Sequence, residues 1–167
     1  MTLSKYASTA LLGAVLFAGS ALAEPADTAK AAGKDASWLF VQTAQGAKFD
    51  GKALTLIGIN PLVVMFTDRP VRLAETIAIT TFIKDWGNGG KSSFVADPPN
   101  AGLTSVVDGK LQTATVELTL PHLEGTTLLY QARVLEGNPP VAGGATSVFI
   151  DSNCPSVSFP GPCPRRH

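Results

Sequence analysis

The amino-acid sequence predicts an all-β protein, an antiparallel β-sandwich (Ig-like or similar) of about eight short strands with at most one short helix. Two observations lead to this fold class. From Trp38 onward, period-two alternation of apolar and polar residues outweighs helical periodicity. Turn-forming sequences also recur roughly every 8–12 residues, as is typical of sandwiches and barrels. A small β-barrel is the alternative architecture. A parallel α/β fold is not expected, because long helical patterns between the strands are missing.

The strongest strand signals form a three-stranded meander in the second half of the chain. In Thr113–Leu120 the alternate apolar residues, which would share one face, are Ala114, Val116, Leu118 and Leu120. Asp108-Gly109 connects this run to Leu103–Val107, and such a pair suits a type I′ turn because both central residues take positive φ. After the link His122–Thr126 comes Thr127–Glu136, with one apolar face made of Leu128, Tyr130, Ala132 and Val134.

The other elements have weaker signals. The predicted strands are, in chain order, Ser37–Thr43, Ala53–Ile59, Leu62–Thr67, Thr76–Thr80, a short run that begins at Phe94, and Ala145–Ile150. Asp50-Gly51 and Asn60-Pro61 supply turns between the first three strands. Residues 72–86 fit both strand and helical periodicity, so a helical turn is predicted at Thr81–Trp86, after the fourth strand.

Length and composition indicate one folded domain, residues 37–151. The chain has 167 residues, of which 45% are hydrophobic and 16% charged, and this balance excludes wholesale disorder. A domain of this size buries enough surface to fold without a metal or a disulfide. Thirteen basic and thirteen acidic side chains cancel, which argues against a nucleic-acid partner because no net positive charge is available for phosphates.

The first 23 residues have the features of a secretory signal peptide. Lys5 supplies the positive start, an apolar run follows, and Ala21-Leu22-Ala23 matches the small-x-small cleavage pattern, which places cleavage between Ala23 and Glu24. The apolar run is about half the length that a membrane span needs, and no transmembrane segment is expected elsewhere. Residues 24–36 are predicted to be a flexible lead-in. The sequence therefore predicts a periplasmic or secreted protein.

Both cysteines lie in the Pro-rich tail, residues 152–167. In an exported chain, Cys154 and Cys163 predict a disulfide, which would contribute about 2.5–3 kcal/mol through its short loop. Metal binding by Cys154, Cys163 and His167 is the alternative, although the spacing matches no common zinc module. No metal site and no cofactor are expected.

Five loop residues are the candidates for binding, because binding residues concentrate on loops that a rigid scaffold holds. They are Asp68, Arg69, Trp86, Asp97 and Asn100. The Arg69 guanidinium suits a carboxylate or another anion, and Trp86 beside a Gly-rich loop suits stacking. Each has a structural alternative. Asp68 and Arg69 would be opposite charges at the rim of the sheet, Asp68, Asp97 and Asn100 would bond to the backbone of their turns, and Trp86 would seal the edge of a core. Calcium binding by Asp97 and Asn100 is a minor alternative, because calcium needs six or more oxygens and no dense acidic loop is present.

His122 is the only histidine inside the predicted domain. A hydrolase site would need a recognisable context such as Gly-x-Ser-x-Gly, which this sequence lacks. No catalytic residue is therefore assigned, and an envelope hydrolase that uses His122 stays an alternative.

Several short motifs resemble an uncharacterised family of exported bacterial β-rich proteins. The motifs are Phe66-Thr67-Asp68-Arg69-Pro70, Trp86, the run from Phe94 to Ala101 with its Asp97-Pro98-Pro99-Asn100, residues 134–137 and residues 147–151. The resemblance covers about Trp38 to Asp151 and implies one exported domain. It implies no activity and no catalytic residues, and it does not extend to the cysteines of the tail.

The expected function is that of an exported, non-catalytic β-domain that binds an envelope protein or a small ligand. A purely structural protein is the other alternative besides the hydrolase. The sequence does not predict the oligomeric state.

Overall fold

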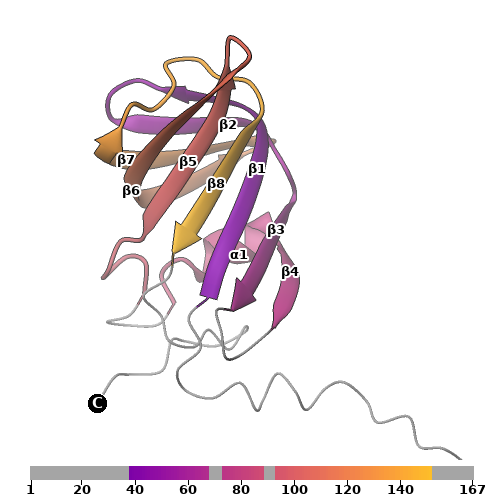
Figure 1. Ribbon diagram of the computed structural model, residues 1–167. Coiled ribbons are helices and arrows are strands. Elements are labelled where there is room, and N and C mark those ends of the chain that lie inside the picture. The colour runs from indigo at the N-terminus through magenta and orange to yellow at the C-terminus, as the bar shows by residue number, and fades with distance from the viewer. Residues whose placement is uncertain (1–37, 68–72, 89–92, 152–167) are drawn as a thin grey trace, which may run out of the picture.

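The computed structural model describes residues 38–67, 73–88 and 93–151 and has the predicted all-β, antiparallel class with one short helix. Figure 1 shows the strands wrapped around a common interior, with the helix behind β1 and β3. The elements are β1 (Trp38–Phe49), β2 (Ala53–Ile59), β3 (Leu62–Thr67), β4 (Ala74–Ala78), α1 (Ile79–Asp85), β5 (Asn100–Val107), β6 (Lys110–Glu124), β7 (Thr127–Gly137) and β8 (Thr146–Asp151).

Six of the strands pair in a closed ring. The order is β1–β2–β7–β6–β5–β8 and back to β1, and every pairing is antiparallel. A sandwich has two separate sheets, whereas here one continuous sheet closes on itself. The architecture therefore corresponds to the small barrel that the sequence analysis offered as the alternative.

The long strand β1 makes this closure possible because its two halves have different neighbours. Its first half pairs with β3, from Trp38↔Thr67 to Val41↔Val64, and its second half pairs with β2. Strand β8 runs along its other edge. Strands β3 and β4 therefore extend from the ring as a flap beside β1, and β4 is the edge strand of the described sheet.

The turns between strands follow the predicted chemistry. Asp50 Oδ1 accepts hydrogen bonds from the backbone N–H groups of Lys52 (2.9 Å) and Ala53 (2.7 Å), which closes the β1–β2 link. These bonds lower the pKa of the Asp50 carboxyl, because they favour its charged form. At the β5–β6 hairpin, Asp108 and Gly109 both have positive φ, as a type I′ turn requires.

Four local predictions are wrong. The strand predicted at Thr76–Thr80 lies at Ala74–Ala78, and the helix begins at Ile79 instead of Thr81. The run at Phe94 is a turn rather than a strand, since Ser93 C=O accepts from the N–H groups of Ala96 and Asp97. His122 lies inside β6 instead of in a hairpin link. Leu120 is 69% exposed instead of facing the core, because its φ of 49° accompanies a register shift in the β6–β7 pairing that rotates the side chain outward.

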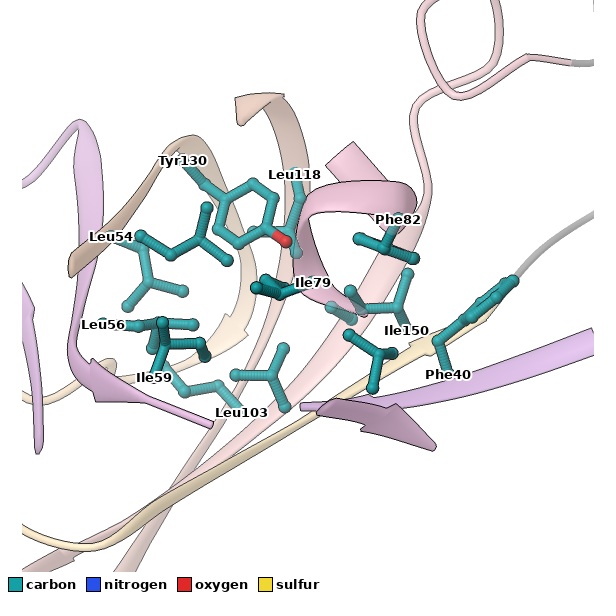
Figure 2. Packing of buried hydrophobic residues seen from close by; sticks show 14 of the residues in the cluster. Phe40, Leu54, Leu56, Ile59, Ile79, Phe82, Leu103, Leu118, Tyr130 and Ile150 are labelled. Carbon is teal, nitrogen blue, oxygen red and sulfur yellow. The ribbon is translucent and has the colours of Figure 1, made fainter. Parts of the chain in front are cut away.

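The helix fills the interior of the barrel near β3. Ile79 and Phe82 are buried on α1, and Figure 2 shows Ile79 pointing among side chains that come from strands on opposite sides of the ring. Phe82 packs edge-on against Phe40 of β1 with ring centroids 5.1 Å apart. The flap thus returns the chain into the barrel, where the helix contributes apolar side chains that the six ring strands alone do not supply.

Candidate functional site

The predicted loop site is described only in part. Asp68 and Arg69 lie outside the described residues, and so do Ala23, Glu24, Cys154 and Cys163. Trp86 is 4% exposed and belongs to the core, where its ring packs 4.7 Å from that of Phe94 and 5.6 Å from that of Tyr130. Its ring therefore presents no free face for stacking on a ligand, and its position matches the alternative in which it seals the edge of the core.

Asp97 and Asn100 are both exposed, one at the end of a turn and the other at the start of β5. Neither side chain caps the turn through a hydrogen bond to the described residues. Ser93 does so instead, because its hydroxyl accepts a hydrogen bond from Ala96 N–H at 3.2 Å. The buried Pro99 anchors the segment, since its C=O accepts from Leu118 N–H at 3.0 Å. Asp97 and Asn100 are therefore exposed on the surface, whereas Trp86 is buried in the core.

The hydrolase alternative finds no assembled site in the described part of the chain. His122 is exposed on β6 opposite Leu129, and its imidazole has no hydrogen bond or ion pair with any described residue. Within the same residues, no group of three or more His, Cys, Asp and Glu side chains is placed to hold a metal ion.

Among the described residues, the barrel interior contains two buried polar pairs. In one, the hydroxyl oxygens of Ser105 and Thr146 lie 2.7 Å apart. The other joins Tyr130 and Gln42. Tyr130 donates a hydrogen bond from its hydroxyl to Gln42 Oε1 at 3.0 Å, and both side chains are almost fully buried. Burial raises the pKa of the Tyr130 phenol far above its ordinary value, because the charged form would lose its hydration. Gln42 Nε2 and Trp86 Nε1 are buried without a hydrogen-bond partner among the described residues. This arrangement holds the core together and leaves the phenol neutral at ordinary pH.

The described surface has one ion pair. Arg133 of β7 lies directly opposite Glu117 of β6 and donates two hydrogen bonds to its carboxylate, at 2.8 and 3.2 Å. The guanidinium lowers the pKa of the Glu117 carboxyl. An exposed cross-strand pair of this kind contributes little to stability and is typical of a solvated sheet.

The most distinctive surface of the described structure is apolar. We define the outer apolar face as a set of outward-facing apolar side chains on three neighbouring strands. They are Leu62, Val64 and Phe66 of β3, Leu39 and Val41 of β1, and Phe149 of β8. Strand register joins them, because Val41 is paired with Val64 on one side and with Phe149 on the other, and Leu39 is paired with Phe66. Leu62, Val64 and Phe149 are 54%, 46% and 51% exposed, and the other three are half-buried.

Open space continues this face beyond β8. Gly102 of β5 is paired with Phe149, and a Cβ atom at Gly102 would meet no other atom within 4 Å. The exposed Phe149 ring therefore stands beside bare backbone, with Asp151 and Ser147 at the borders of the apolar surface. Single exposed apolar residues are common on the surface of any soluble protein. A contiguous group of them on adjacent strands is instead typical of an interaction surface.

The sequence contains a signal for this face that the search for loop residues missed. A strand with one solvent-exposed face alternates between apolar and polar residues. Three segments are instead continuously apolar: Trp38–Val41, Leu62–Phe66 and Val148–Ile150. Such runs indicate strands that are apolar on both sides. Only the tertiary pairing shows that all three runs lie side by side.

The described residues include no helix that would cross a membrane, since α1 has only seven residues. Comparison with protein-family models, curated proteins and solved structures finds no match to this chain.

Proposed function

We propose that this protein is an exported, non-catalytic binding domain whose outer apolar face recognises an apolar surface on a protein of the cell envelope. The observation that carries the proposal is the row Val64–Val41–Phe149, in which three strands expose apolar side chains in register. Removing such a face from water contributes roughly 25 cal/mol per Å² of buried apolar area, from which the entropic cost of association is subtracted.

The shape of the face favours a protein partner over a small ligand. Small ligands bind in concave sites that cover most of their surface. The outer apolar face instead lies on the outside of a sheet, with Leu62, Val64 and Phe149 standing out from it. A partner that presents its own apolar side chains would pack against these three as one sheet packs on another.

Export is the second part of the proposal. The features of Met1–Ala23 support it, and a cleaved chain would begin at Glu24. Mass spectrometry of the protein from fractionated cells tests this part, and a chain that retains Met1–Ala23 in the cytoplasm would contradict it.

A photo-crosslinking residue tests the binding surface directly. p-Benzoylphenylalanine at Phe149 keeps an aromatic ring on the outer apolar face, and the same residue at Leu111, 73% exposed at the β5–β6 hairpin, is the matched control. We expect one discrete adduct from position 149, identified by mass spectrometry, and none of that mass from position 111. Excess wild-type protein should abolish the adduct, whereas excess Val64→Ser/Phe149→Ser protein should not. Equal adducts at both positions, or none at 149, would contradict the assignment of the face.

A further inference from the structure

The outer edge of β4 has no paired strand among the residues that the structure describes. β4 is bonded only to β3 in the described sheet. Thr67 N–H donates to Leu73 C=O at 3.0 Å and Ile79 N–H to Pro61 C=O at 2.8 Å, and both pairs continue the β3–β4 register. Antiparallel pairs alternate between bonded and non-bonded, so the backbone groups of the even-numbered residues Ala74, Thr76 and Ala78 point away from β3.

This edge has few of the features that natural edge strands use against pairing. Proteins block such edges with proline, lysine, bulges or charged side chains that point inward. Residues 74–78 contain no proline or lysine, and their pairing with β3 has no register shift. Glu75 is the only charge and lies on the inner side of the flap, in register with Met65. The inward position of Glu75 and the shortness of the strand are therefore the two protections that this edge has.

We infer that a second copy of this chain pairs along β4, antiparallel about a twofold axis at Thr76. This register sets Thr76 opposite the partner's Thr76, Ala74 opposite the partner's Ala78, and Glu75 opposite the partner's Ile77. It uses all five residues of the strand. A shift of two residues toward the N-terminus would set Glu75 opposite the partner's Glu75, and like charges in that position are unfavourable.

The pairing satisfies backbone groups and joins the two outer apolar faces. It forms about four hydrogen bonds between the strands, because the Thr76 pair exchanges two and each Ala78 N–H reaches an Ala74 C=O. The Ala78 C=O is left to the first turn of α1, for which Ala78 is the N-cap. A twofold axis perpendicular to the sheet keeps the outer apolar faces on the same side. The dimer leaves these faces open, so it does not depend on the function proposed above.

Proline at position 76 tests this register. Thr76→Pro removes an outward N–H but no β3–β4 hydrogen bond, and edge strands tolerate proline at such positions. Thr76→Val keeps the backbone and is the matched control. Sedimentation of the full chain over a range of concentrations, under reducing conditions so that Cys154 and Cys163 do not link copies, should give dimers for wild type and Thr76→Val. Association of Thr76→Pro should be about tenfold to hundredfold weaker, since two symmetry-related bonds are lost.

Hydrogen exchange provides a second readout that needs no variant. The amides of Ala74, Thr76 and Ala78 should exchange quickly in dilute protein and become protected as concentration rises, whereas the amide of Leu111 should not change. A wild-type chain that stays monomeric at every concentration overturns the inference. So does a Thr76→Pro chain that is folded by circular dichroism and dimerises as well as wild type, or protection confined to other strands.

Discussion

The buried hydrogen bond between Tyr130 of β7 and Gln42 of β1 allows a specific prediction about the stability of the protein. Tyr130→Phe keeps the ring and its contact with Trp86 but removes the hydroxyl that donates to Gln42 Oε1. Because Gln42 Nε2 already has no partner among the described residues, the whole buried amide would then be unpaired. Leaving a buried polar group unsatisfied costs about 1–3 kcal/mol, and we expect the free energy of unfolding to fall by that amount.

A substitution of the acceptor, Gln42, and a double variant complete the test. Gln42→Leu leaves the Tyr130 hydroxyl unpaired but also removes the unpartnered Nε2, so its cost should be smaller. In Tyr130→Phe/Gln42→Leu both polar groups are gone, and stability should return to within about 1 kcal/mol of wild type. The two single effects should therefore not add, with a coupling of roughly 1–3 kcal/mol.

Urea unfolding, followed by the fluorescence of the buried Trp38 and Trp86, gives the free energy of unfolding of the wild type, the two single variants and the double variant. The slope with denaturant should be common to the four, so that midpoints compare directly. Two results would refute the reasoning: a Tyr130→Phe chain as stable as wild type, or single effects that add in the double variant. Either would mean that the buried amide finds another partner when the hydroxyl is lost.

Three further predictions follow from individual residues. Gly137→Ala should destabilise by at least about 1 kcal/mol more than Gly109→Ala, because both have similar positive φ but only at Gly137 would a Cβ lie 2.7 Å from a backbone oxygen; thermal unfolding compares them. Leu118→Ala should cost about 2–5 kcal/mol as a fully buried side chain, whereas Leu111→Ala should stay within about 0.5 kcal/mol; equal midpoints in urea would contradict this. In a chain that begins at Glu24, Tyr130 is the only tyrosine, so tyrosinate absorbance should appear only with alkaline unfolding. The raised pKa of Tyr130 gives stability that is present below about pH 10 and lost as pH rises further, and a tyrosine that titrates while the protein is still folded would refute this.

The binding face and the edge strand have different consequences for the whole molecule. If both proposals hold, two copies present their outer apolar faces on one side of a continuous sheet, and a partner with two apolar sites would bind more tightly than one with a single site. The Phe149 and Thr76 variants separate the two ideas, because the first alters side chains on the face and the second alters backbone donors at the edge.

Local structure was predictable where a residue acts through its own neighbours. Asp50 and Asp108-Gly109 form the expected turns, since their conformations depend on adjacent backbone groups. The burial of Ala114, Val116 and Leu118 follows the alternation of the strand. At Leu120 the same rule is wrong, because a register shift against β7 changes which side the residue faces, and no local pattern encodes that shift.

The all-β fold class and the approximate positions of most strands thus came from the sequence alone, because alternation and turn chemistry act over a few residues. The strand limits did not, since β1 and β6 both extend well beyond the predicted runs. The closure of the ring, the burial of Trp86 and the outer apolar face were decided by the tertiary structure. The outer apolar face depends on β1 lying between β3 and β8, which are distant in sequence. The ring closes through the pairing of β1 with β8 and of β2 with β7, and Trp86 is buried against Phe94 and Tyr130. The apolar runs of β1, β3 and β8 can be seen in the sequence. The pairing between distant strands, however, is set by how the whole chain buries its apolar surface. Only the folded structure therefore shows that these runs lie on one face.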